Sequence, residues 1–502
     1  MAAEPDGKLD RRILTIASVV VLGAIMSILD TTVVNVAINT LARDFETDLP
    51  TIQWIVTGYT LALATVIPVS GWAADRFGTK RLYMLSIGLF VVGSALSGLA
   101  WSAGSLIGFR VLQGLGGGML MPCGMTILMR AAGPQRVGRV MAIIGVPMLL
   151  GPILGPILGG WLVDNASWRW IFFINLPIGI VAFVASLRIL DRDEPQPGER
   201  FDTLGLFLLS PGLALLIYGL AKSVTAGFGS AEVWGTSGAG AILIVLFVFH
   251  ALRTPHALVD LRLFKNRTFT AAAGTLILMI ISVFGGMLLL PLYLQTVRGE
   301  SAFNSGLLLA PQGIGAMLVM PIAGQLTDKT GVGKIVMPGL LLLAATTFAL
   351  TQLTGDTSYW VLSAILFVMG VGMGFAMMPL MSGAMQTLRK AAVARASTTL
   401  NIIQQVGASI GVAILSVILT SQLQDRFGEQ SGGAGAAAGQ KVPLEIANKM
   451  ADAYGATFWW ALALIVPAIL CALLLPRTKP EPVEDDEGGA GADDATPVLM
   501  HV

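Results

Sequence analysis

Long apolar runs alternate with short polar segments along almost the whole chain. A helix that crosses a bilayer needs about 20 mostly apolar residues, and the pattern predicts fourteen helices of this kind. Their predicted first residues are Ile13, Ile52, Leu82, Ser105, Val140, Trp170, Leu204, Gly238, Phe269, Ser305, Ile335, Tyr359, Ser397 and Thr457. The sequence therefore predicts an all-α, polytopic membrane protein.

The positive charges test this number of helices independently. Lys and Arg concentrate in the cytoplasmic loops of membrane proteins. With fourteen spans and a cytoplasmic N-terminus, most of the 31 Lys and Arg residues fall on the inner side. Omitting any one helix would invert every later loop and remove this bias. We therefore expect both termini in the cytoplasm.

The composition places the chain in a membrane and excludes several function classes. The chain is 55% hydrophobic and only 12% charged, whereas an average soluble domain is about 25% charged. A net charge of +1 gives no indication of a nucleic-acid partner. Arg exceeds Lys, and Ala and Gly are abundant, which is typical of a bacterium with a GC-rich genome. We expect a multi-pass protein of the bacterial cytoplasmic membrane, surrounded by lipid.

The chain divides into two similar blocks and an insertion. Residues 1–190 are predicted to form a six-helix bundle, 191–266 a charged linker with two additional helices, and 267–478 a second six-helix bundle. Residues 479–502 form an acidic tail that we expect to be disordered. The segments Gly71–Gly78 and Gly324–Gly331 each end the second helix of a bundle and resemble one another. Internal repeats of this kind are typical of secondary transporters.

One carboxylate interrupts the first apolar helix. Asp30 lies about two-thirds of the way along it, where a charged side chain costs about 2.5–3.5 kcal/mol and usually faces a cavity or a proton path. Arg110 lies in the fourth helix at a depth that agrees within about 6 Å, at about 1.5 Å per residue. We predict that the two side chains pair. The alternatives are a static buried salt bridge for Asp30, and for Arg110 a side chain that extends to the membrane interface.

Glycines and prolines form a ridge on the predicted fifth helix. Glycines spaced by four residues allow close helix contact, and prolines bend a helix. The residues are Gly145, Pro147, Gly151, Pro152, Gly155, Pro156 and Gly159. The pattern favours a bent, moving interface over a kinked helix that serves packing alone.

These motifs resemble those of a known family. The segment 71–81 resembles the loop between helices two and three of the major facilitator superfamily, and the fifth-helix ridge resembles the motif of its antiporters. The segments Leu29–Ala37 and Trp168–Gly179, and the residues around Arg110, are similar to those of the fourteen-helix drug:proton antiporters of the EmrB/QacA type. The resemblance covers nearly the whole chain. It implies two six-helix bundles plus two inserted helices.

The resemblance also implies roles for single residues. Asp75 and Arg76 would hold the inward-closed state, and Asp30 with Arg110 would handle the proton. The full predicted gating set is Gly71, Asp75, Arg76, Gly78, Arg81 and Asp328. In contrast to some relatives, helices nine to fourteen carry no acidic residue in their apolar stretches. This difference argues against a strong preference for dications and against coupling to more than a single proton.

Polar and soft side chains are predicted to line a substrate cavity between the bundles. They are Asn35, Gln53, Trp54, Tyr59, Gln113, Gln312, Gln404 and Gln405. Each of them alone is also consistent with a hydrogen bond between helices. The 22 methionines support an adaptable surface, because flexible thioethers suit promiscuous binding.

The expected function is proton-coupled export of small amphipathic or lipophilic compounds, with the proton gradient as the energy source and no cofactor or obligate protein partner. The alternatives are a dedicated exporter of a lipid, antibiotic or metabolite, and a sensor that no longer transports. An enzyme is not expected, because the sequence shows no acid–base pair, nucleophile–base pair or metal cluster. Cys123 and Cys471 lie in apolar runs and suggest no disulfide or metal site. No GxxxxGK[ST] loop indicates ATP as the energy source.

Overall fold

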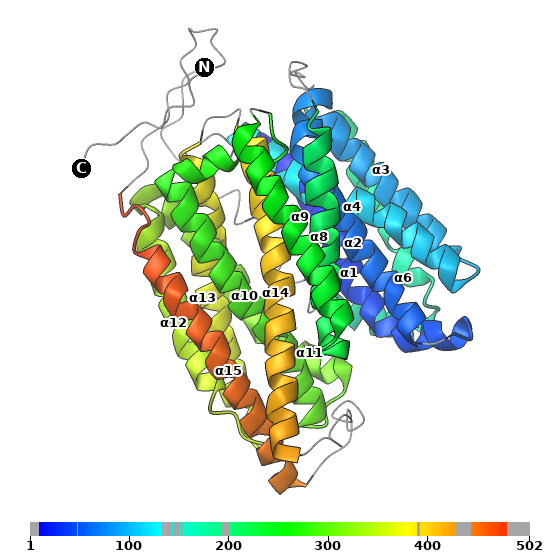
Figure 1. Cartoon of the computed structure of the whole chain (residues 1–502), viewed down its shortest axis with the longest axis vertical. Coiled ribbons are helices and arrows are strands. Elements are labelled where there is room, and N and C mark those ends of the chain that lie inside the picture. Colours follow the sequence, from blue (N-terminus) through cyan, green and yellow to red (C-terminus); the bar gives the residue numbers. More distant parts are fainter. Residues whose placement is uncertain are drawn as a thin grey trace.

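The computed structural model describes residues 10–47, 49–132, 136, 143, 151, 154–155, 157–163, 165–191, 201–227, 229–254, 256–388, 392–427 and 443–478. Within these ranges the chain is helical and contains no β-strand. Thirteen of the described helical segments are long and apolar enough to cross a membrane. Their long axes run close to one another and roughly upright in Figure 1.

The first bundle lies on the right of Figure 1, in blue to cyan. Its described helices are α1 (Arg11–Asp44), α2 (Leu49–Phe77), α3 (Thr79–Gly98), α4 (Ala103–Ala132), α6 (Trp170–Phe173) and α7 (Asn175–Ile189). The segments α6 and α7 together make one span, Trp170–Ile189. The predicted helix from Val140 lies mostly outside the described residues, although 157–163 are helical. Thirteen of the fourteen predicted spans are therefore present in the described part of the chain.

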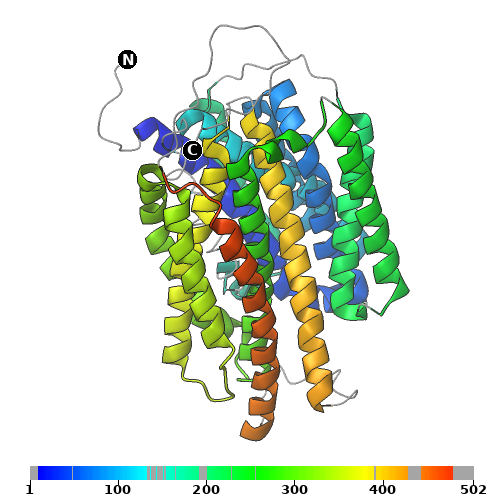
Figure 2. The same cartoon turned by 60° about the vertical axis from the view of Figure 1, so that its left-hand side comes forward.

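The second bundle lies on the left of Figure 1 and follows two inserted helices. The inserted helices are α8 (Thr203–Ala226) and α9 (Ala231–Arg253), and a short 3₁₀ helix, η2 (Leu261–Lys265), leads out of them. The bundle consists of α10 (Arg267–Thr296), α11 (Ala302–Thr330), α12 (Val332–Leu350), α13 (Tyr359–Gln386), α14 (Val393–Phe427) and α15 (Leu444–Ala472). Helices α8 and α9 pack on each other, and α8 contacts α2 and α14. Figure 2 shows this hairpin beside α14 at the flank of the molecule.

Two helices begin earlier than the apolar pattern predicts. Helix α9 begins at Ala231 instead of near Gly238, and α15 begins at Leu444 instead of near Thr457. The first turns of α15 are polar, and Lys449 lies 3.1 Å from Glu445 in an i,i+4 ion pair. An apolar run marks only the part of a helix that lipid surrounds, whereas i,i+4 pairs support further turns in water.

The repeat detected in the sequence is also a repeat in the backbone. Gly78 joins α2 to α3 with φ 94° and ψ 141°, and Gly331 joins α11 to α12 with φ 95° and ψ 151°. Both conformations lie in a region that glycine adopts readily and other residues avoid. The second and third helices of the two bundles are therefore joined by the same turn.

Glycines of α4 bring its neighbours close and fix its rotation. A Cβ added at Gly114 would lie 2.5 Å from the carbonyl oxygen of Tyr59 on α2. A Cβ added at Gly116 would lie 2.6 Å from the backbone nitrogen of Phe90 on α3. Small residues permit this approach between helices in a membrane. As a result, the turn of α4 that carries Arg110 is held between α2 and α3.

Candidate functional site

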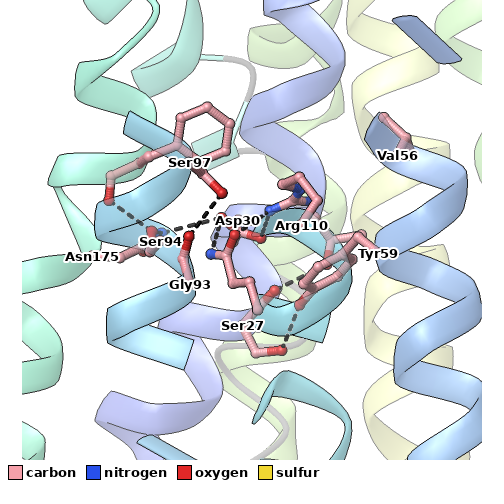
Figure 3. Close-up of polar contacts among 12 residues, drawn as sticks. Ser27, Asp30, Val56, Tyr59, Gly93, Ser94, Ser97, Arg110 and Asn175 are labelled. Atoms are coloured by element: carbon pink, nitrogen blue, oxygen red, sulfur yellow. Dashed lines mark hydrogen bonds and ion pairs between the residues drawn. The ribbon is translucent and has the colours of Figure 1, made fainter. Parts of the chain in front are cut away.

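The centre of the first bundle contains a buried ion pair (Figure 3). The Arg110 Nη1 atom on α4 lies 2.5 Å from Asp30 Oδ2 on α1. Each residue has only 1% of its surface exposed. The structure therefore places together the two residues that the sequence singled out for proton coupling. Burying two charges is costly in free energy unless the pair has further hydrogen bonds.

Two amides supply those further hydrogen bonds to the carboxylate. Gln113 Nε2, one turn after Arg110, donates to Asp30 Oδ1 at 2.9 Å. Asn175 Nδ2, at the start of α7, donates to the same oxygen at 3.1 Å. Gln113 Oε1 in turn accepts a 2.8 Å hydrogen bond from Arg110 Nη1. Asp30 thus receives three donors from two helices, an arrangement that suits the charged form of a carboxylate.

Aromatic rings and a backbone carbonyl enclose the guanidinium of Arg110. Its Cζ lies 4.1 Å from the centroid of the Tyr59 ring and 5.6 Å from that of Phe172. Its Nε donates to the Ile55 carbonyl oxygen at 3.4 Å. The Tyr59 hydroxyl lies 3.3 Å from Ser27 Oγ on α1. Stacking on aromatic faces compensates a guanidinium for part of its lost hydration.

Asn175 and Ser94 belong to this network, and sequence reasoning assigned them no role. Asn175 Nδ2 also donates to Ser94 Oγ on α3 at 3.1 Å, and Ser94 Oγ donates to the Phe172 carbonyl oxygen at 2.8 Å. Both side chains are buried. Asn175 could have been noticed as an amide inside an apolar helix, since a buried polar group needs a partner. A serine in a helix gives no such signal, because its hydroxyl usually bonds its own backbone.

The turn between α2 and α3 carries the predicted gating residues. Asp75 Oδ1 lies 3.1 Å from Arg130 Nη2 at the end of α4, and Arg130 Nη1 donates to Thr79 Oγ1 at 3.0 Å. Arg76 and Arg81 are exposed. Lys80 Nζ donates to the carbonyl oxygens of Leu187 and Leu190 at the end of α7, at 3.0 and 2.6 Å. The turn therefore ties together the ends of four helices in the first bundle, α2, α3, α4 and α7.

Near the same end, α2 meets α14 of the second bundle. A Cβ added at Gly71 would lie 2.9 Å from Thr398 Oγ1. The Ser70 and Thr398 hydroxyl oxygens are 3.2 Å apart, and Ser397 Oγ donates to the Pro122 carbonyl oxygen on α4 at 3.2 Å. The two bundles are therefore in close contact at the end that carries the Gly78 turn.

In the second bundle, Asp328 occupies the position that matches Asp75. Gln386 Nε2, at the end of α13, donates to Asp328 Oδ1 at 3.1 Å. Helix α13 is the fourth helix of its bundle, as α4 is of the first. In each bundle the aspartate before the turn therefore contacts a residue at the end of the fourth helix. The contacting group is the Arg130 guanidinium in the first bundle and the Gln386 amide in the second.

Three of the ridge residues are described, and all three face α1. A Cβ added at Gly151 would collide with the Ile28 side chain, and one added at Gly155 with the Thr32 side chain. At Gly159 it would lie 2.9 Å from the Val33 carbonyl oxygen. The other predicted ridge residues lie outside the described residues; they are Gly145, Pro147, Pro152 and Pro156. The described glycines pack against the segment of α1 that carries Asp30.

Comparison with known proteins decides the family. A family model described as the Major Facilitator Superfamily matches residues 20–412. The chain belongs to this superfamily. A Multidrug resistance protein B homolog from Mycobacterium tuberculosis is 45% identical over 497 residues, covering 95% of this chain and 92% of that protein. The Putative multidrug resistance protein MdtD of Escherichia coli is 33% identical over 406 residues, covering 80% and 85%.

Solved structures of the superfamily show the same fold. The proton:xylose symporter XylE superposes with a TM-score of 0.60 at 14% identity, covering 91% of this chain and 94% of that chain. The human organic anion transporter MFSD10 superposes with a TM-score of 0.59 at 16% identity, covering 91% and 100%. The predicted fold class is therefore confirmed, and the chain is a multi-pass membrane transporter.

The predicted cavity residues of this transporter lie in both bundles. Tyr59 and Gln113 belong to the Asp30 network. Trp54 is 42% exposed and stacks on Tyr218 of α8, with ring centroids 5.6 Å apart. Three predicted cavity residues lie in the second bundle. Gln312 donates to Met373 Sδ at 3.2 Å, Gln404 donates to Met381 Sδ at 3.0 Å, and Gln405 is half-buried. The side chains of Asn35 and Gln53 lie outside the described residues. A common role in substrate binding stays a prediction.

Proposed function

We propose that this transporter exports small lipophilic or amphipathic compounds in exchange for protons, and that Asp30 carries the proton. Support for the cargo class comes from the names of two relatives, a Multidrug resistance protein B homolog and a Putative multidrug resistance protein. Support for the coupling comes from the buried ion pair. The proposal needs no cofactor and no partner protein, because a proton gradient supplies the energy.

The single observation that carries the proposal is the position of Asp30. It is a fully buried carboxylate in a spanning helix, with donors on α4 and α7. Adding a proton removes its charge and changes which groups it can bond, so its protonation state biases the packing of three helices. A group whose two states favour different conformations can couple proton movement to transport.

The contact between α2 and α14 provides the conformational part of the cycle. We place the Gly78 and Gly331 turns on the cytoplasmic side, as the distribution of Lys and Arg favours. The close contact of Gly71 with Thr398 then closes the transporter on that side. Opening requires this contact to separate, and the Asp75–Arg130 pair holds the ends of the helices that must move.

The test is transport by purified protein in vesicles with an imposed pH gradient. Ethidium, the neutral dye Nile red and a fluorescent phospholipid serve as three separate probes. Asp30→Asn, which keeps the residue neutral, should abolish uphill accumulation of any transported probe, while passive exchange persists. Asp30→Glu should retain partial coupling, and Asp425→Asn at the exposed end of α14 is the control. Wild-type accumulation by Asp30→Asn would contradict the proposal.

A further inference from the structure

We propose that Asn175 is a positioning residue that transmits the protonation of Asp30 to the junction between α6 and α7. This inference rests on the proposed function, because it assumes that Asp30 takes up the proton. It adds a defined route by which that event changes the backbone. The route consists of Asp30, Asn175, Ser94 and the Phe172 carbonyl group.

The route is continuous in the structure (Figure 3). Asn175 is the first residue of α7, and Ile174 separates it from the end of α6 at Phe173. Its amide nitrogen donates to both Asp30 Oδ1 and Ser94 Oγ, each at 3.1 Å. Ser94 then donates its only hydrogen to the Phe172 carbonyl oxygen at 2.8 Å. The donors therefore point away from the Asn175 amide, toward Asp30 on one side and toward Ser94 and Phe172 on the other, and Asp30 is the acceptor of the first bond.

Protonation of Asp30 reverses the first of these bonds. A proton on Oδ2 would face Arg110, which has donors only and cannot accept a hydrogen bond. A proton on Oδ1 faces two amides, Gln113 and Asn175, and one of them must turn to present its oxygen. Gln113 is held in place because its Oε1 already accepts from Arg110. Asn175 is free to turn, because its second partner is a hydroxyl, which can accept or donate.

Rotation of the Asn175 side-chain amide changes the hydrogen-bond acceptor of Ser94. When the Asn175 oxygen replaces its nitrogen, the Ser94 hydroxyl can donate to that oxygen, and it then leaves the Phe172 carbonyl group. Residues just before α6 make contacts at the other end of the bundle. Trp168 Nε1 donates to Asp44 Oδ2 at the end of α1 at 2.7 Å, and Arg169 Nη2 donates to the Ala100 carbonyl oxygen at 3.4 Å. A change at Phe172 therefore reaches the loops of the first bundle opposite the Gly78 turn.

Few other titratable groups face Asp30 among the residues that the structure describes. In this part of the chain, Tyr59 on α2 and Arg110 on α4 are the titratable groups that interact with it electrostatically. The described residues of α3, α6 and α7 that approach the network are neutral: Ser94, Phe172 and Asn175. The described ridge residues that pack on α1 are glycines. A pH response of this region therefore reports on Asp30.

The test measures that pH response without depending on cargo. Spin labels are attached at the positions changed by Trp101→Cys and Trp360→Cys. The two tryptophans are 76% and 87% exposed, and each lies at the start of the fourth helix of its bundle. The native cysteines are replaced by Cys123→Ala and Cys471→Ala. The distance between the labels is measured against pH in the full chain in lipid nanodiscs.

Asn175→Leu and Ser94→Ala should each reduce the pH-dependent change in distance at least threefold. Asn175→Gln, which keeps the amide, should restore part of the response. Ser97→Ala is the matched control, since Ser97 is buried on the same helix and, within the described residues, its hydroxyl donates to the Gly93 carbonyl oxygen of its own helix at 2.8 Å.

Asp30→Asn separates the two proposals. If its label distance still responds to pH as in the wild type, the assignment of the proton to Asp30 is wrong. If Asp30→Asn abolishes the response while Asn175→Leu and Ser94→Ala behave as the wild type, the route through Asn175 is wrong and the proposed function stands. An equal loss in Ser97→Ala would also contradict the route, because it would show a general effect of altering α3.

Discussion

The two bundles share a backbone plan but differ in the chemistry of their interiors. The first bundle buries the Asp30–Arg110 pair with two amides. In the described spanning helices of the second bundle the charged residues lie near the helix ends, and the one furthest inside is Asp452, the ninth residue of α15. Its α13 instead buries six methionines: Met369, Met373, Met377, Met378, Met381 and Met385. The amides of Gln312 and Gln404 donate to the sulfur of Met373 and Met381.

This comparison shows which features the two bundles share as part of the fold and which features can differ between them. The Gly78 and Gly331 turns have nearly the same dihedral angles, and an aspartate precedes each turn by three residues. Between these ends, a polar network joins α1, α4 and α7 in the first bundle, whereas α13 of the second bundle buries six methionines. A fixed charge network permits few arrangements, whereas methionine side chains adapt to many. The first bundle is therefore the part suited to a two-state change.

The largest expected effect comes from breaking the ion pair. Arg110→Gln leaves the Asp30 carboxylate buried without its cation and should reduce the free energy of unfolding by about 3–5 kcal/mol. The double variant Asp30→Asn/Arg110→Gln should recover most of that loss but no transport. Thermal unfolding in detergent measures stability, with Arg426→Gln at the exposed end of α14 as the control. An additive loss in the double variant would show that the two residues are not coupled.

The contact of the fifth helix with the first helix occurs in both bundles. Gly155 packs on Thr32 of α1, and Gly411 of α14 packs on Ile281 of α10. Adding bulk at a close contact costs about 1–3 kcal/mol. We expect Gly155→Leu to insert in the membrane but to block transport, because it faces the segment with Asp30. Gly88→Leu, with no atom within 4 Å of an added Cβ, is the control. Wild-type transport by an inserted Gly155→Leu would show that this contact does not move.

The matching turns should both be destabilised by the same substitution. Gly78→Ala and Gly331→Ala each place a Cβ on a backbone with φ near +95°, and strain of this kind costs about 1–3 kcal/mol. We expect a decrease in thermal stability for both variants and a larger one for Gly331→Ala, because its added Cβ would also collide with the Thr478 carbonyl oxygen. Gly88→Ala, in an open helical position, should be neutral or slightly stabilising. An unchanged thermal stability in either turn variant would show that the turn does not need glycine at that position.

The smallest expected effect concerns the Asp75–Arg130 pair. Arg130 has 40% of its side chain exposed, so the coupling between the two residues should be about 0.2–1 kcal/mol in a double-mutant cycle. Asp75→Asn should lower the turnover number for a transported dye more than its affinity, because the pair holds helix ends and does not touch cargo. A large loss of affinity with normal turnover per bound ligand would place Asp75 in the binding site instead.

Most of the fold follows from the apolar pattern, because lipid demands long apolar helices and leaves little choice between them. The pattern located thirteen described spans but set the start of α15 too late, since the helix continues as polar turns. Depth along α1 and α4 was sufficient to bring Asp30 and Arg110 together. Depth alone did not reveal that Ser94 belongs to the network or that the Asn175 side chain points toward Asp30. Those contacts depend on the rotation of each helix, which close glycine packing sets and hydrophobicity does not reveal.

The insertion of α8 and α9 has a topological consequence. Because the two helices come as a hairpin, the chain returns to the side from which it left the first bundle. An insertion of one helix would have turned α10–α15 over and moved the Gly331 turn to the face opposite the Gly78 turn. Two helices are therefore the smallest insertion between the two halves that keeps both halves in the same orientation across the membrane. Added elements can be gained or lost in such pairs while the two halves keep their relative orientation.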